Sequence, residues 1–241
     1  RGDVKRMVSD YQGALTDLDV SIRRDPKSAV ALSSRGEARR NLGDKVGALA
    51  DLDAALRIDP KFQFALRSRG DLKWELKDYL GAIADLDAVL SLDPQSAFAL
   101  RLRGDAKRML NDYGNAIADL NASLLLDPTS AFALRSRGEA RRMISDYPLA
   151  LEDFNAALDL DPTSAFALRS RGDIKRVQGD YTGAIDDLDE ALRFEPESAW
   201  ALRGRGEAKR LLGDYIGAIA DFDESLRLEP QNVFSLGSRG Q

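Results

Sequence analysis

The stretch AFALRSRGDIKRVQGDYTGAIDDLDEALRFEPES at residues 165–198 decides the fold. Small and apolar residues recur at helical spacing on both sides of Gly179-Asp180, namely Ala167, Leu168, Gly172 and Ile174 before it and Ala184, Ile185, Leu188, Ala191 and Leu192 after it. The stretch therefore predicts a helix, a short turn and a second helix. We expect Asp180 to be the N-cap of the second helix. The acid-proline pair at Pro196 should end it, because the residue before a proline is disfavoured in the helical conformation.

The same pattern returns every 34 residues along the chain. Arg-Gly dipeptides place glycines at Gly2, Gly36, Gly70, Gly104, Gly138, Gly172, Gly206 and Gly240, and acid-proline pairs place prolines at Pro26, Pro60, Pro94, Pro128, Pro162, Pro196 and Pro230. A period of this length indicates one supersecondary unit that is repeated, each copy burying its apolar face against its neighbours. We expect helices near residues 29–42 and 46–58, with equivalents in every later unit.

Composition narrows the classes of function. The 241 residues include no cysteine and no histidine, which removes disulfides, thiol nucleophiles, imidazole bases and nearly all zinc sites. We expect no enzyme activity, no metal and no cofactor, because the carboxylates recur in every unit whereas an active site would break the repeat locally. No apolar run approaches the roughly 20 residues that cross a bilayer, and no signal peptide is recognisable, so a cytoplasmic location is expected.

The unit resembles the tetratricopeptide repeat (TPR), and the resemblance covers the whole chain. The family's pattern of a large apolar residue, Leu-Gly, Tyr, Ala, Phe and Pro falls on Leu202, Arg205, Gly206, Lys209, Ala218, Phe222 and Pro230. Two columns depart from it, because arginine replaces Leu, and lysine or arginine replaces Tyr. The resemblance implies an all-α fold of tandem helix-turn-helix repeats, stacked into a right-handed superhelix (an α-solenoid) that serves protein–protein interaction.

In this register the chain is one array spanning residues 1–241. The full units are 29–62, 63–96, 97–130, 131–164, 165–198 and 199–232, and the partial units are 1–28 and 233–241. Because the chain starts at Arg1 within a first helix, we expect it to be a portion of a longer array that lacks polar capping repeats.

Charged residues also recur on the apolar side of the helices. The arginines are Arg35, Arg69, Arg103, Arg137, Arg171 and Arg205, and the acids on the second helices are Asp51, Asp85, Asp119, Asp153, Asp187 and Asp221. An unpaired buried charge costs several kcal/mol, so we predict a ladder of partly buried Arg–Asp pairs between neighbouring helices.

A second set of side chains forms a stripe on each first helix, opposite its apolar side. The stripes are Phe98, Arg101, Asp105 and Arg108; Phe132, Arg135, Glu139 and Arg142; Phe166, Arg169, Asp173 and Arg176; and Trp200, Arg203, Glu207 and Arg210. Since first helices line the concave face of TPR arrays, the resemblance implies that these residues contact a partner. The lysine and asparagine clamp of the chaperone-binding branch is not assigned, because arginine, Asp or Glu, serine and phenylalanine stand in its places.

Two interpretations of the stripes stay open. In one, each stripe is a solvated helix face on which an arginine pairs with the acid four residues later and the aromatic ring fills space between repeats. In the other, two arginines for each acid leave a positive charge beside an aromatic ring, which suits carboxylates or phosphates on an extended chain. Charge favours the second, because residues 165–178 carry a net +3 and residues 180–198 a net −6.

The leading functional hypothesis is a non-enzymatic scaffold whose concave groove binds an extended or helical partner segment, preferably acidic. One alternative is a structural array whose uncapped ends stack on further copies. Another is binding of single-stranded nucleic acid through arginine and phenylalanine, against which the pI near 5.0 argues. No membrane partner is expected.

Overall fold

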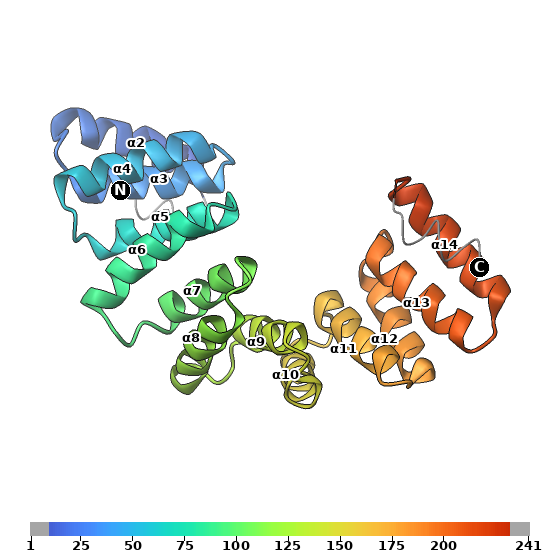
Figure 1. The fold of residues 1–241 in the computed structure, drawn as a ribbon. Coiled ribbons are helices and arrows are strands. Elements are labelled where there is room, and N and C mark those ends of the chain that lie inside the picture. The colour runs from blue at the N-terminus through green and yellow to red at the C-terminus, as the bar shows by residue number, and fades with distance from the viewer. Residues whose placement is uncertain (1–9, 232–241) are drawn as a thin grey trace. The chain divides into compact units, whose positions relative to one another are not determined.

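The computed structural model describes residues 10–231, and within that range the chain forms 13 α-helices and no strand (Figure 1). The prediction of an all-α chain of tandem helix-turn-helix repeats is confirmed. The first helix expected to begin before Arg1, the partial unit 233–241 and the expected uncapped ends fall on residues 1–9 and 232–241, which lie outside the described residues.

Two kinds of helix alternate along the chain. The first helices of the repeats are α3 (Ala29–Asn41), α5 (Gln63–Glu75), α7 (Ala97–Met109), α9 (Ala131–Met143), α11 (Ala165–Val177) and α13 (Ala199–Leu211). The second helices are α2 (Tyr11–Arg24), α4 (Lys45–Ile58), α6 (Tyr79–Leu92), α8 (Tyr113–Leu126), α10 (Tyr147–Leu160), α12 (Tyr181–Phe194) and α14 (Tyr215–Leu228). These bounds agree within a residue with those expected for the unit 29–62.

Side-chain caps begin both kinds of helix. The carboxylate of Asp180 accepts from the Gly183 amide at 2.9 Å, as predicted for the second helices. Five of the six first helices begin at a serine that the sequence analysis did not identify, as where Ser164 Oγ accepts from the Ala167 amide at 3.4 Å. The exception is α5, where Phe62 provides no side-chain cap. Each second helix ends at the residue before the acid-proline pair.

The turn between the two helices of a repeat needs one residue in the left-handed conformation. Gly179 has a φ of +86°, and the Asp180 amide donates back to the Lys175 carbonyl at 2.9 Å, which closes the end of α11. Residues with a side chain hold this position in three other repeats, at Lys77, Asn111 and Ser145, with φ of 63–64°. Strain is therefore expected at those turns.

The chain forms two compact units, residues 1–127 and 128–241. In each unit a first helix packs against the second helix of its own repeat and against the one before it. Consecutive first helices also contact one another, α3 with α5 and α5 with α7 in the first unit, and α9 with α11 and α11 with α13 in the second. We call the surface that they share the first-helix face.

Close approach of the two helices in a repeat depends on the Arg-Gly glycine. A Cβ added to Gly172 would lie 3.1 Å from Leu188 Cγ and 3.2 Å from the Ala184 carbonyl oxygen. Leu188 and Ile174 are fully buried beside it, so the glycine lets the core of each repeat close.

The predicted Arg–Asp ladder is present within each repeat. In the fifth full unit, Arg171 donates from Nε to Asp187 Oδ2 at 2.9 Å and from Nη2 to Oδ1 at 2.7 Å. The same pair forms between Arg35 and Asp51, Arg69 and Asp85, Arg103 and Asp119, Arg137 and Asp153, and Arg205 and Asp221. Each aspartate is buried.

A second cation that the sequence analysis missed completes each ladder step. It lies one turn after the arginine, as Lys175 does, and its ammonium group is 2.8 Å from Asp187 Oδ2. Arg39, Lys73, Lys107, Arg141 and Lys209 are its equivalents. Loss of the ladder arginine therefore leaves the buried carboxylate with one cation rather than none.

Candidate functional site

The sixteen predicted contact residues lie on the first helices, one stripe each on α7, α9, α11 and α13. Their side chains are half-buried, except for Asp105, which is buried. The stripe on α7 belongs to the first unit and the other three belong to the second, where they lie on consecutive packed helices.

In the second unit, aromatic rings and guanidinium groups alternate across the first-helix face. The guanidinium carbon of Arg135 is 6.0 Å from the ring centre of Phe132 and 5.9 Å from that of Phe166. Arg169 lies 4.9 Å from Phe166 and 5.1 Å from Trp200. Each arginine thus contacts the aromatic ring of its own repeat and that of the next. We call Phe132, Arg135, Phe166, Arg169, Trp200 and Arg203 the arginine–aromatic column.

The first unit contains the same arrangement with one residue that the sequence analysis missed. Arg67 of α5 stacks 3.9 Å from the ring centre of Phe98, and Arg101 lies 5.1 Å from the same ring. Arg67 stands 34 residues before Arg101, so the period alone could have identified it. Cation–π contacts of this kind contribute about 0.5–2 kcal/mol, the larger value where water is excluded.

Two arginines of the column carry charges that no carboxylate neutralises directly. Among the described residues, Arg169 makes no ion pair, and burial lowers its pKa although the charges of Glu195 and Glu139 oppose this. Arg135 Nη1 donates to the Ser164 hydroxyl at 3.3 Å, while its buried Nε has no hydrogen-bond partner in the described structure. Arg203 differs, since it pairs with Glu229 at 2.6 Å. The column therefore offers unused N–H donors beside aromatic faces.

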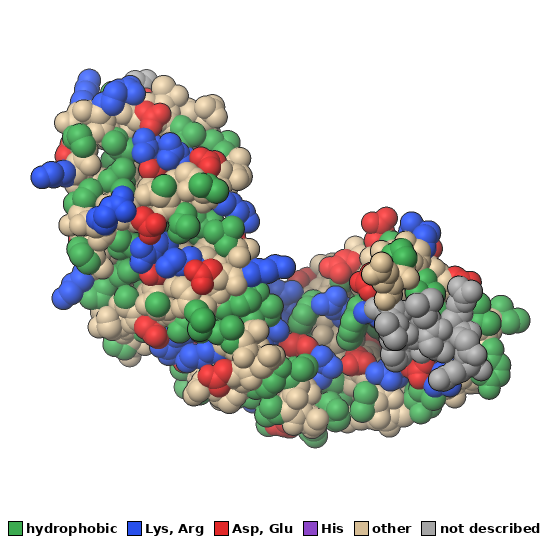
Figure 2. Space-filling model, turned by 45° about the horizontal axis from the view of Figure 1, so that its top comes forward, with side chains coloured by type: hydrophobic (Ala, Val, Ile, Leu, Met, Phe, Trp, Pro, Cys, Tyr) green, Lys and Arg blue, Asp and Glu red, His purple; other side chains and the backbone are tan. Residues whose placement is uncertain are grey.

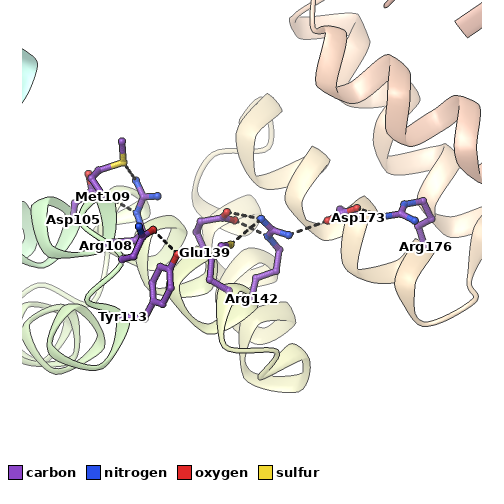
Figure 3. A network of polar contacts seen from close by, with 10 residues as sticks. Asp105, Arg108, Met109, Tyr113, Glu139, Arg142, Asp173 and Arg176 are labelled. Atoms are coloured by element: carbon purple, nitrogen blue, oxygen red, sulfur yellow. Dashed lines mark hydrogen bonds and ion pairs between the residues drawn. The ribbon is translucent and has the colours of Figure 1, made fainter. Parts of the chain in front are cut away.

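The second arginine of each stripe is engaged with acids of the same face (Figure 3). Arg142 pairs with Glu139 at 2.7 Å and with Asp173 of the next repeat at 3.0 Å, and Asp173 also accepts from Arg176 at 2.6 Å. The hydrogen bond to Glu139 raises the pKa of Arg142, although burial opposes it.

The acid of each stripe thus pairs with the arginine three residues later. Arg108 with Asp105 and Arg210 with Glu207 repeat the geometry. The expected pairing of Arg169 with Asp173, four residues later, is wrong, because the later arginine binds the acid instead and leaves Arg169 to the aromatic rings.

A hollow on the first-helix face lies between α11 and α13. It has a volume of about 270 Å³ and is lined by Asp173, Arg176, Trp200, Arg203, Gly204 and Glu207. Five of these residues belong to the predicted stripes. The volume is slightly below the range of roughly 300–1,000 Å³ for small-molecule sites, so it suits a single side chain rather than a cofactor.

Acidic and basic groups are interspersed on the surface drawn in Figure 2, in both units. Within residues 10–231 no cluster of three or more acidic side chains is arranged to hold a metal ion. In the same range, every helix is too short or too polar to cross a membrane.

A family model described as tetratricopeptide repeat matches residues 1–61, 67–131, 103–165 and 169–233. No curated protein sequence matches significantly. Three similar solved structures illustrate the fold. A tetratricopeptide repeat protein from Parabacteroides merdae ATCC 43184 is 21% identical, with 99% of this chain and 94% of that chain covered and a TM-score of 0.73.

The descriptions of two further structures name a hetero-tetramer and a peptide-binding site. The Cut9–Hcn1 hetero-tetramer of the APC/C contains a chain that is 20% identical over 96% of this chain and 45% of its own length, with a TM-score of 0.83. YrrB, described as a TPR protein with an unusual peptide-binding site, is 20% identical over 77% of this chain and 95% of its own, with a TM-score of 0.62. At these identities the likeness establishes the fold.

Proposed function

The chain belongs to the tetratricopeptide repeat family, and we propose that it is a non-enzymatic interaction scaffold whose first-helix face binds an extended or helical segment of a partner protein. The partner segment is acidic. The family match and the peptide-binding site described for YrrB support the scaffold. The acidic preference rests on the residues of this chain.

The observation that carries the proposal is the arginine–aromatic column. Arg135 and Arg169 lie between aromatic rings without a carboxylate partner, so their charge is available to an incoming acid. A guanidinium group that lies between two rings is already restrained, and binding then costs less side-chain entropy. The rings give apolar contact to the same ligand.

The proposal assigns different roles to the two arginines of a stripe. Arg101, Arg135, Arg169 and Arg203 contact the partner, together with Phe98, Phe132, Phe166 and Trp200. Arg108, Arg142 and Arg210 pair with Asp105, Glu139 and Glu207 of their own helices, and Arg142 also pairs with Asp173 of the next first helix, so these groups mainly stabilise the first-helix face itself.

Affinity should grow with the number of repeats that a ligand spans, because each exposed charge contact is weak and adds to the next. It should fall as salt rises, since the charges of ligand and protein are screened within about 10 Å at 0.1 M ionic strength.

The test is titration calorimetry with a library of acidic peptides at low and high salt. We expect Arg135→Glu combined with Arg169→Glu to weaken binding at least about tenfold, the equivalent of one lost charge-assisted contact. The matched control is Arg193→Glu with Arg227→Glu, which makes the same charge change at exposed positions of the second helices α12 and α14.

Two results would contradict the proposal. One is equal binding by the wild type and the first-helix variant when circular dichroism shows unchanged helix content. The other is an equal loss with the control, which would mean that only net charge matters. Binding of single-stranded RNA in preference to every peptide would favour the nucleic-acid alternative.

A further inference from the structure

Among the described residues, a hydrogen bond links consecutive first helices of the same unit except between α11 and α13. Arg40 donates to Asp71 of the next repeat at 2.8 Å, Trp74 to Asp105 at 3.0 Å, and Arg142 to Asp173 at 3.0 Å. The next equivalents are Arg176 and Glu207. Both line the hollow of about 270 Å³, and no hydrogen bond joins them.

The acceptors around this hollow are already occupied. Asp173 accepts from Arg142 through Oδ2 and from Arg176 through Oδ1. Glu207 accepts from Nε and Nη2 of Arg210, at 2.9 and 2.7 Å, and this pairing lowers the pKa of Glu207. Both carboxylates are therefore already paired with arginines, and they offer little to a ligand that donates hydrogen bonds.

Donors, by contrast, remain unused. Arg176 gives one N–H to Asp173, and its Nε is buried without a hydrogen-bond partner in the described structure. Arg203 gives one N–H to Glu229 from the other side of the hollow. A guanidinium group carries five N–H donors, so two such groups present more donors than the described residues accept. The indole of Trp200 adds an apolar wall.

We propose that the hollow between α11 and α13 is an anion pocket that receives one carboxylate or phosphate group of the partner segment. An anionic side chain accepts from Arg176 and Arg203 while its aliphatic part lies against Trp200. The pocket exists because Arg176 and Glu207 do not form the contact that Arg142 and Asp173 form between α9 and α11. This inference rests on the proposed function, because the bound segment carries the anion. The position of the pocket then determines where along the segment a negative charge is required.

Trp200 can report directly on this pocket. The chain has two tryptophans, and Trp74→Arg restores at α5 the residue that other repeats place there, so that Trp200 becomes the sole fluorophore. The probes are the N-acetyl methylamides of glutamate, glutamine and phosphoserine, titrated against this variant. We expect a saturable change in Trp200 emission with the two anions and at least about tenfold weaker response to glutamine, since a neutral amide gains no charge-assisted bond. The anion that binds more tightly identifies the source of the negative charge.

The control compares Arg176 and Arg108, which hold the same position in two different repeats. Arg176→Gln should abolish the preference for glutamate over glutamine, whereas Arg108→Gln, in the first unit and outside the hollow, should leave it intact. An equal response to glutamate and glutamine, no response to either anion, or a preference that survives Arg176→Gln would overturn the anion pocket. Failure of the scaffold proposal is separate, because it is read from long peptides and the Arg135 and Arg169 changes rather than from Trp200.

Discussion

Removing both cations around one ladder aspartate should cost more than the sum of the two single losses. Asp187 is 5% exposed and is held by Arg171 through two hydrogen bonds and by Lys175 through an ion pair at 2.8 Å. Arg171→Leu keeps the lysine, so we expect a loss of about 2 kcal/mol, the value of charge-assisted hydrogen bonds. Lys175→Met keeps the arginine and should cost about 1 kcal/mol.

The double change leaves a buried carboxylate without a cation. Such an unpaired charge costs 3–5 kcal/mol, so we expect about 5 kcal/mol, roughly 2 kcal/mol beyond the sum of the single changes. Adding Asp187→Leu removes the charge itself and should restore stability to within about 2 kcal/mol of the wild type. Urea unfolding followed by circular dichroism measures all four variants.

Strict additivity of the two single changes would refute this reasoning. So would a triple variant no more stable than the double one, because the loss would then come from packing and not from an unpaired carboxylate. Urea is the suitable denaturant, since guanidinium chloride is itself a salt and would screen the ladder.

Two further predictions concern the turns and the pH. Ser145→Gly should stabilise the chain by about 1 kcal/mol, because Ser145 has a φ of 63°, a backbone conformation that favours glycine. Gly179→Ala should destabilise the chain by a similar amount, and no atom lies within 4 Å of the new Cβ to add a steric effect. Thermal unfolding of both variants measures these changes, and a fall in stability for Ser145→Gly contradicts the prediction. Pairing with Arg210 lowers the pKa of Glu207, so this ion pair stabilises the fold above the unfolded pKa of Glu207 near 4.5, and the stabilisation is lost as the pH falls through the lower folded pKa. The urea midpoint should therefore decline less between pH 6 and 3 in Arg210→Gln than in the wild type. Parallel curves for the two proteins would exclude this contribution.

The fold followed from the sequence because each boundary has a local cause. Asp180, Pro196 and the glycine at 179 mark helix ends through capping, backbone exclusion and the left-handed turn, and the structure places the ends there. Serine caps were missed because Ser164 follows a loop in which several small polar residues compete for the role. The division into two compact units could not be predicted, because the composition of the repeats does not change at the boundary between residues 127 and 128.

The Arg–Asp ladder was predictable because an aspartate on the apolar stripe of a helix is buried, and an unpaired buried charge is costly. The second cation of each ladder step was not predicted, because Lys175 lies one turn after Arg171 and its position in the sequence is also that of an ordinary solvated lysine. In the site, the sequence placed the stripes on the correct helices but misassigned their pairs. Asp173 binds Arg176 rather than Arg169 because of side-chain rotamers and because Arg142 of the preceding repeat also binds it. The periodicity of the sequence contains no information on either factor.

A paramagnetic label on the bound peptide tests the central claim most directly. We would attach a nitroxide to an acidic peptide that binds and record amide resonances of the second unit. The account predicts broadening along α9, α11 and α13, strongest near Arg135 and Arg169, with α10, α12 and α14 affected far less. Broadening centred on the second helices would contradict it and would place the partner on the opposite face.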